Sequence, residues 1–245
     1  VYSFPESTGG VMSPFLLREE IQTLREKRQG VLSPEYYREL SDLLLTAGKI
    51  PAAMNLLEHA LLNRERFSPN PSVLGLEEVR ACFRRGLEYA DACLYEEAAD
   101  CLIQALEAGY DTFETHYCLA GVYKSLGNLN LAGQHCRKSL EHYPAFSPAF
   151  ILLGSIVKLE GRLPESIDAV RQALSIDPDC AAAYYDLACY LALAGDREPA
   201  LDALEQALAK GFEDLEWLLR DPDLDSLRKL LRYELLLRFH NPKNG

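Results

Sequence analysis

One pattern recurs along this chain at intervals of 34 residues. The stretch HYCLAGVYKSLGNLNLAGQHCRKSLEHYP, residues 116–144, aligns with residues 150–178 and 184–212 downstream and with 82–110 upstream. A fifth copy, residues 37–65, starts 45 residues before the upstream one, so 11 extra residues interrupt the period there. A constant period of this length is typical of proteins that stack one small unit repeatedly, and it strongly limits the possible folds.

Small side chains stand at three fixed places in every copy. The first place holds Ser41, Gly86, Ala120, Gly154 and Ala188; the second holds Ala53, Ala98, Ala132, Ser166 and Ala200; the third holds Ala60, Ala105, Ser139, Ala173 and Ala207. Small side chains allow two helices to approach closely, with larger apolar side chains filling the grooves around them. The pattern therefore predicts closely packed helices.

Each copy also contains the signals for two helices and a turn. In the copy 150–178, Phe150, Leu153 and Val157 are spaced as on one face of a helix, and the second half repeats this spacing. Gly161 can end the first helix in the left-handed conformation, and Pro164 suits the first turn of the next helix. Because one such hairpin cannot bury its apolar face alone, the copies are predicted to stack.

These residues resemble the tetratricopeptide repeat family over roughly residues 34–214. The resemblance implies an all-α, right-handed superhelix, an α-solenoid of five helix-turn-helix repeats with capping helices at both ends. The second repeat departs from the family pattern: Arg85 stands where other copies have leucine, and Cys93 replaces the turn glycine. The closing proline is present only at Pro144 and Pro178.

The expected organisation follows from the period. The ranges are 1–33 for an extended segment and an N-terminal capping helix, 34–67 for repeat one, 68–78 for an insertion loop, 79–112, 113–146, 147–180 and 181–214 for repeats two to five, and 215–245 for C-terminal capping helices. The N-terminal helix is interpreted as a cap, with an independent interaction helix as the alternative. In the C-terminal segment, Leu224, Leu227, Leu231 and Leu235 are predicted to seal the last repeat, and a basic interaction helix is the alternative.

Charge and composition exclude several classes of partner. The net charge is −12, and residues 79–214 alone carry 11 basic against 21 acidic residues. Such a region repels phosphate, which argues against nucleic acid and anionic membrane surfaces as partners. No stretch is apolar for long enough to cross a bilayer, so no direct membrane insertion is predicted. Seven cysteines without a regular spacing indicate reduced thiols and a cytoplasmic location, although an upstream targeting segment could precede Val1.

Neither catalysis nor metal binding is predicted. The five histidines are spread over different repeats, and the sequence lacks a glycine-rich phosphate loop, a Gly-x-Ser-x-Gly motif and a His-Glu-x-x-His motif. No cysteine forms a Cys-x-x-Cys pair, and His135 and its neighbour Cys136 point in different directions on a helix. We therefore expect no enzyme, no cofactor and no metal.

The family resemblance places the ligand-binding surface on the concave side, which the first helices line. The residues expected there are Phe83, Leu87, Tyr117, Lys124, Ile151, Lys158 and Tyr185. The family's carboxylate clamp of Lys, Asn and Arg is not matched, which argues against a chaperone co-factor of that type. Aromatic and aliphatic anchors in a trough are suited to a hydrophobic peptide or an amphipathic helix.

The sequence therefore predicts a protein-interaction adaptor or assembly chaperone, with the anchors holding a partner segment and Lys124 and Lys158 orienting an acidic or terminal group. Two alternatives stay open. The anchors could be covered by the chain itself, through residues 1–12 or the C-terminal cap. The protein could also be a self-associating scaffold, a homo-oligomer in which the groove of one copy receives the N-terminal segment of the next.

Overall fold

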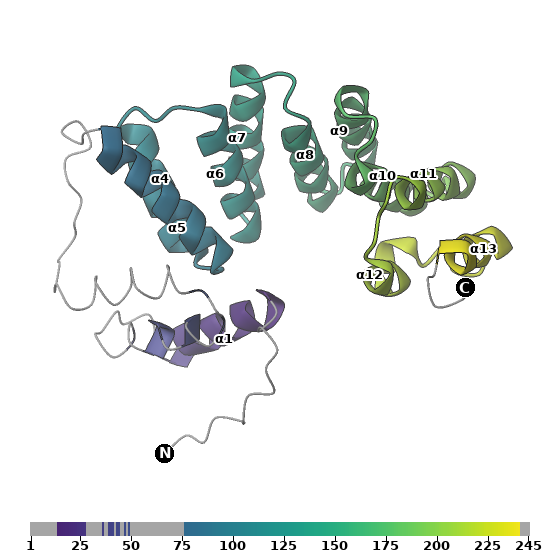
Figure 1. Cartoon of the computed structure of the whole chain (residues 1–245), viewed down its shortest axis with the longest axis horizontal. Helices are drawn as coiled ribbons and strands as arrows, with labels where there is room; N and C mark the ends of the chain where they lie inside the picture. The colour runs from purple at the N-terminus through teal and green to yellow at the C-terminus, as the bar shows by residue number, and fades with distance from the viewer. Residues whose placement is uncertain are drawn as a thin grey trace, which may run out of the picture. The chain divides into compact units, whose positions relative to one another are not determined.

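The computed structural model describes residues 14–27, eight positions between Tyr36 and Lys49, and residues 76–240. All regular elements within these residues are helices (Figure 1). Internal contacts divide the chain into an N-terminal unit, residues 1–111, and a C-terminal unit, residues 112–245. Among the described helices, none has the length and apolar character needed to span a bilayer.

The N-terminal unit contains α1 (Pro14–Lys27), α4 (Leu76–Asp91) and α5 (Tyr95–Glu107). The helices α4 and α5 pack as a hairpin. Cys93 lies in its turn with φ of +60°, a left-handed conformation that normally requires glycine. Alignment of the repeats within the sequence placed Cys93 where the other repeats have the turn glycine. The backbone confirms that this position needs a positive φ.

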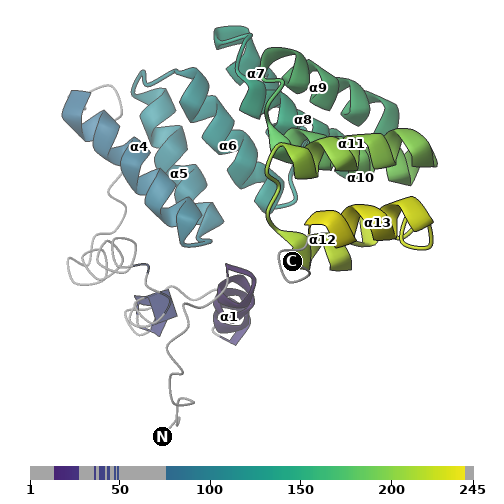
Figure 2. The same cartoon turned by 45° about the vertical axis from the view of Figure 1, so that its right-hand side comes forward.

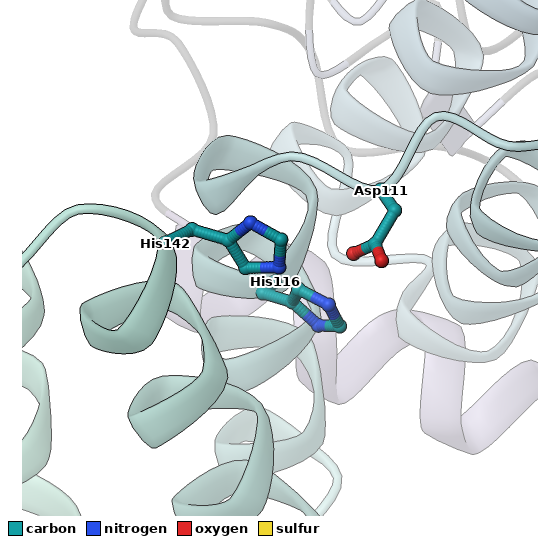
Figure 3. A group of neighbouring side chains, drawn as sticks. All are labelled: Asp111, His116 and His142. Atoms are coloured by element: carbon teal, nitrogen blue, oxygen red, sulfur yellow. The ribbon is translucent and has the colours of Figure 1, made fainter.

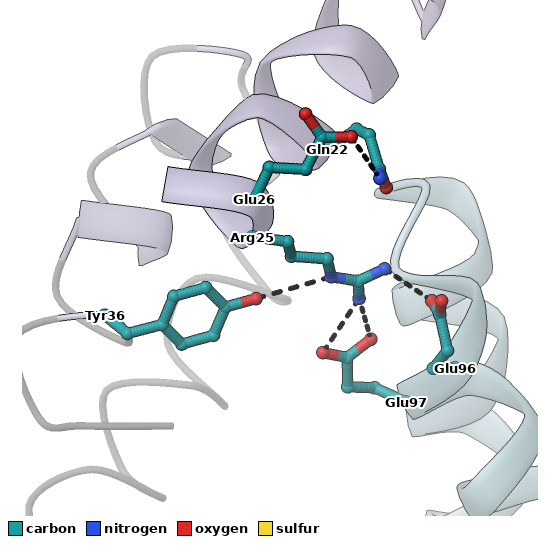
Figure 4. A network of polar contacts seen from close by, with 6 residues as sticks. All are labelled: Gln22, Arg25, Glu26, Tyr36, Glu96 and Glu97. Carbon is teal, nitrogen blue, oxygen red and sulfur yellow. Dashed lines mark hydrogen bonds and ion pairs between the residues drawn. The ribbon is translucent and has the colours of Figure 1, made fainter. Parts of the chain in front are cut away.

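An arginine on α1 connects this helix to α5 within the N-terminal unit. Figure 4 shows the Arg25 guanidinium between Glu96 and Glu97, with Nη1 lying 2.6 Å from Glu96 and Nη2 lying 2.9 Å from Glu97. Its Nε donates to the Tyr36 hydroxyl at 3.4 Å. Both glutamates lie in the first turn of α5, where negative charge also stabilises the helix dipole. The contact joins α1 to the second repeat, and the interpretation of α1 as a cap of repeat one stays a prediction.

The C-terminal unit is a series of helical hairpins, seen as successive pairs in Figure 2. Its helices are α6 (Phe113–Ser125), α7 (Leu129–His142), α8 (Ser147–Leu159), α9 (Leu163–Ile176), α10 (Ala181–Ala194) and α11 (Arg197–Ala209). Each helix packs on the next, and the first helices also contact one another, α6 with α8 and α8 with α10. The hairpin turns contain Gly127, Gly161 and Gly195, all with positive φ. These features confirm a repeat architecture of the α-solenoid type.

The positions predicted to be small lie where helices meet. Ala120, Ala132 and Ala173 are fully buried. At Gly154 on α8, a Cβ atom would lie 2.9 Å from a methyl carbon of Val170 and 3.2 Å from the backbone oxygen of Ser166. Distances this short leave no room for a side chain, so the size restriction seen in the sequence has a steric cause.

The C-terminal cap consists of α12 (Leu215–Arg220), the 3-10 turn η2 (Pro222–Leu224) and α13 (Leu231–His240). Figures 1 and 2 both place α12 and α13 beside the last hairpin, and α13 contacts α11. The buried apolar side chains of this cap are Leu218, Leu224, Leu227, Tyr233 and Leu236.

The prediction for the sealing leucines was partly wrong. Leu224 and Leu227 are buried as expected, but Leu231 is 71% exposed and Leu235 is 40% exposed. The prediction assumed that the four leucines share one continuous helical face. The chain instead leaves η2 and starts a new helix at Leu231, which resets the helical phase and turns Tyr233 and Leu236 inward.

One predicted boundary also needs correction. The insertion loop was expected to extend to residue 78, but α4 already begins at Leu76. The extended segment 1–12 and most of repeat one, predicted over 34–67, lie outside the described residues.

Candidate protein-binding face

The first helices of the C-terminal unit carry equivalent side chains at 34-residue spacing. Tyr117 on α6, Ile151 on α8 and Tyr185 on α10 occupy one such position, and Lys124 and Lys158 occupy another. Because α6 contacts α8 and α8 contacts α10, these positions follow one another on one side of the unit. We call this set of five residues, together with Ser155, the first-helix face.

The α10 part of the face is closed by the chain itself. Tyr185 is only 7% exposed, and its ring stacks on Phe212 with centroids 4.2 Å apart. Its hydroxyl donates to Asp221 Oδ2 at 2.5 Å, and burial raises the pKa of this phenol. The expectation of Tyr185 as an accessible anchor is therefore wrong, because the C-terminal cap covers it.

The cap also reaches the neighbouring lysine. Lys158 Nζ lies 2.5 Å from Asp223 Oδ2, and both side chains are mostly buried. Asp221, which is itself 5% exposed, fixes the turn by accepting the Asp223 backbone N–H at 2.9 Å. Lys158 thus already holds a carboxylate, which the turn η2 supplies.

The α6 and α8 part of the face is more open. Tyr117 and Ile151 are half-buried, and Tyr117 meets Phe146 edge-on with centroids 5.1 Å apart. Lys124 Nζ donates to Ser155 Oγ at 2.8 Å, and within the described part of the chain no carboxylate lies at ion-pair distance from it. Burial lowers the pKa of this lysine, although the nearby charge of Asp186 works in the opposite direction. A partly desolvated ammonium with a neutral partner is well placed to bind an anion.

The two predicted residues on α4 belong to the N-terminal unit. Phe83 is half-buried and lies against Tyr110 with ring centroids 5.2 Å apart. Leu87, one turn further along α4, is 38% exposed. They form a small apolar surface on that unit.

Asp186 on α10 carries the most perturbed carboxyl near the first-helix face. Burial raises its pKa to about 6, against the opposing influence of Lys124 and Lys158. The folded protein therefore binds a proton at Asp186 more strongly than the unfolded chain does. This contribution to stability is complete below about pH 4 and is lost as the pH rises through about 6.

We expect Asp186→Asn to raise the free energy of unfolding by about 1–2 kcal/mol at neutral pH, after allowance for the partial exposure of the group. At pH about 4, where the native carboxyl is already protonated, the gain should vanish. Urea denaturation at both pH values measures this, with Asp168→Asn on the exposed surface of α9 as the control. An equal effect of Asp186→Asn at the two pH values would contradict the assignment.

The structure also brings together three histidines that the sequence analysis treated as scattered. His116 comes from α6, whereas His135 and His142 come from α7. His116 Nδ1 and His135 Nδ1 lie 2.9 Å apart, and the rings of His116 and His142 stack (Figure 3). Burial, together with His116 and Lys138, lowers the pKa of His135 to about 4. The signal available in the sequence was the seven-residue spacing of His135 and His142, which places them on the same side of α7.

Comparison with solved structures identifies the fold. The crystal structure of MamA matches with a TM-score of 0.55 at 19% identity, covering 72% of this chain and 97% of that one. YrrB, a tetratricopeptide-repeat protein, matches with a TM-score of 0.54 at 23% identity, covering 83% of this chain and 98% of that one.

Sequence comparison gives a shorter match. A chloroplastic protein of Arabidopsis thaliana is 32% identical over 81 residues, which is 32% of this chain and 24% of that protein's length. No protein-family model matches the chain. The helical hairpins, their 34-residue period, the buried small residues and the structural matches together show that the chain has the tetratricopeptide-repeat fold.

Proposed function

We propose that this chain is a non-enzymatic adaptor or assembly chaperone that binds a segment of another protein on the α6 and α8 part of its first-helix face. The segment is a peptide or amphipathic helix with one large apolar side chain and one carboxylate. The apolar side chain packs on Tyr117 and Ile151, and the carboxylate pairs with Lys124.

The arrangement of these three residues carries the proposal. Tyr117 and Ile151 are partly exposed on adjacent first helices, and they provide aromatic and aliphatic surface at low entropic cost. Lys124 lies two turns after Tyr117 on α6, and its hydrogen-bond partner is a neutral hydroxyl. An apolar anchor beside a cation fixes both the position and the direction of a bound segment.

The neighbouring repeat supplies an internal precedent for this chemistry. Lys158, the equivalent of Lys124 in the next hairpin, pairs with the carboxylate of Asp223 in the turn η2. The same turn places Asp221 against Tyr185, the equivalent of Tyr117. The cap thus contacts the tyrosine Tyr185 and the lysine Lys158. We propose that a partner segment contacts the equivalent residues Tyr117 and Lys124 in the same way.

A structural neighbour is consistent with this role. YrrB, which shares the fold at 23% identity, is a tetratricopeptide-repeat protein with an unusual peptide-binding site. In the present chain, Phe83 and Leu87 form an apolar surface on the N-terminal unit, which we propose as a separate protein-contact surface of that unit.

The test begins with selection of binders from a displayed library of random peptides on the immobilised wild-type protein. Selected peptides should be enriched in a large apolar residue together with Asp, Glu or a free C-terminus. Fluorescence anisotropy of one such peptide should give binding at least about tenfold weaker for Tyr117→Ala and for Lys124→Met.

Two variants on other surfaces serve as controls. Tyr184→Ala removes a half-buried tyrosine of α10 that is not part of the first-helix face, and Lys138→Met removes an exposed lysine from α7. Both should bind the peptide like the wild type. Equal affinity for all four variants, or failure to select any peptide that is sensitive to Tyr117, would overturn the proposal.

The self-associating scaffold involves residues 1–12, which lie outside the described residues. It stays a prediction of the sequence analysis. Its test is the solution mass with and without these residues, since it requires loss of an oligomer on truncation.

A further inference from the structure

The helix α13 carries apolar side chains on two of its sides. Tyr233 and Leu236 are buried in the apolar core that α10 and α11 also form, and α13 contacts α11. Leu231, Leu235 and Phe239 are instead 71%, 40% and 82% exposed. Because they recur at every fourth residue, these three side chains are neighbours along one side of the helix. We call Leu231, Leu235 and Phe239 the outer stripe.

The outer stripe is unusual for a helix that covers a repeat array. Such a helix normally presents a polar outer face, which keeps the protein soluble. Phe239 and Leu231 are instead the two most exposed of the large apolar side chains that the structure describes. Single exposed apolar residues are common, but a contiguous row of them is typical of an interaction surface.

The charges beside the outer stripe differ between its two edges. Along one edge, Glu234 and Arg238 are one helical turn apart and exposed, and within residues 76–240 neither side chain forms an ion pair. On the other edge, Arg232 is held by three carboxylates of α11. The edge with Glu234 and Arg238 therefore offers one negative and one positive charge to an approaching surface.

This pattern is complementary to itself when two copies of α13 meet in antiparallel orientation. A two-fold axis near Leu235 brings this residue against Leu235 of the second copy, and Leu231 against Phe239. The same axis brings Glu234 of each copy to Arg238 of the other, so both contacts pair opposite charges. In a parallel orientation each of these charges would meet its like, which is unfavourable.

The charge distribution also favours the cap as the place where two copies meet. Residues 79–214 carry 11 basic against 21 acidic residues, whereas residues 215–245 carry 6 basic against 5 acidic residues. Contact between the repeats of two copies would bring two strongly negative regions together. Contact through α13 avoids this repulsion.

We propose that α13 is a homodimerisation helix, in which the outer stripes of two copies pack antiparallel across a two-fold axis. The contact uses neither residues 1–12 nor the first-helix face, so it is independent of the proposed function and of the scaffold that requires those residues. Three apolar side chains per copy make a small interface beside the about 20–30 residues per side of a standard one. We therefore expect a dissociation constant in the micromolar range.

Sedimentation equilibrium in reducing buffer, from about 1 to about 200 µM protein, should show the mass rising from one chain toward two. Leu235→Glu and Phe239→Glu should each weaken the dimer by at least about tenfold, since the axis places the new charge in the interface twice. Circular dichroism and the melting temperature should stay near the wild type. If Leu235→Glu does not fold, Phe239→Glu, with the more exposed side chain, gives the same test.

Leu159→Glu is the matched control, because Leu159 is a 53% exposed leucine on α8 and the substitution adds the same charge. It should dimerise like the wild type. Deletion of residues 1–12 should also leave the dimer unchanged.

Exchange of the two edge charges tests the antiparallel orientation. Glu234→Arg and Arg238→Glu should each weaken the dimer by about threefold or more at low ionic strength, because like charges then face each other. A mixture of these two single variants should form a mixed dimer about as tight as the wild type, since two arginines of one chain then face two glutamates of the other.

A wild-type chain that stays monomeric at about 200 µM would overturn the proposal and leave the outer stripe to another kind of partner. A dimer that is unaffected by both Leu235→Glu and Phe239→Glu, or one that is lost when residues 1–12 are deleted, would also overturn it. Equal association of the charge variants alone and in the mixture would contradict the antiparallel pairing.

Discussion

Gly154→Leu is expected to lower the free energy of unfolding of the C-terminal unit by about 3 kcal/mol or more. The first atom of any side chain at this place would lie 2.9 Å from Val170 on α9 and 3.2 Å from the backbone of Ser166. The methyl group of Val170 could move slightly, but the backbone oxygen cannot move without separating α8 from α9. Urea denaturation monitored by circular dichroism measures the loss.

Gly121→Ala is the matched control for this substitution. Gly121 also lies within a first helix, α6, but a Cβ atom there meets nothing within 4 Å. Because alanine is the better helix former, Gly121→Ala should leave stability unchanged or raise it by up to about 1 kcal/mol. A large loss for Gly121→Ala, or none for Gly154→Leu, would contradict the packing described for the repeats.

The second large effect is expected for Asp221→Ala, at about 2–4 kcal/mol of lost stability. Asp221 is 5% exposed and accepts the hydroxyl of Tyr185 and the backbone N–H of Asp223. The substitution leaves these donors without their acceptor in a buried place. It should also release the cap from α10, which thermal unfolding and the fluorescence of Trp217 on α12 can report.

Asp214→Ala provides the comparison for this change. Asp214 caps α12 by accepting the backbone N–H of Trp217 at 2.9 Å, but it is exposed. Loss of such a cap typically costs about 1 kcal/mol. If Asp221→Ala costs no more than Asp214→Ala, the turn η2 is not a buried anchor of the cap.

The repeat architecture could be predicted because its causes are local and periodic. Small residues such as Ala120 and Ala132 recur where helices cross, and their complete burial confirms the prediction. Cys93 was recognised as standing at a turn-glycine place, and its φ of +60° follows from the geometry of the turn. Features of this kind depend on spacing alone, which a single sequence displays.

The C-terminal cap was harder to predict because it depends on contacts between residues that lie far apart in the sequence. Nothing in the spacing of Tyr185 distinguishes it from Tyr117, yet Asp221, 36 residues later, folds back and covers it. The prediction for Leu231 and Leu235 was wrong for a related reason. Helical phase is lost at the break before Leu231, and no periodic signal marks how many residues the turn uses.

The histidine cluster was missed because its members come from two different helices. His116 lies in a first helix and His135 in a second helix, and only the hairpin brings their Nδ1 atoms to 2.9 Å. The family pattern could have placed both residues at the α6–α7 interface. The pattern contains no expectation for polar groups at those places, so the five histidines were treated as spread over different repeats.

The most direct test of the central claim is the position of a bound peptide on the protein. Backbone amide NMR signals of the wild-type protein should be recorded with and without a peptide selected from the random library. Binding at the proposed face should give the largest shifts in α6 and α8, around Tyr117, Lys124 and Ile151, with the signals of α7 and α9 little changed. Shifts centred on α11 and α13, with α6 and α8 unaffected, would contradict it.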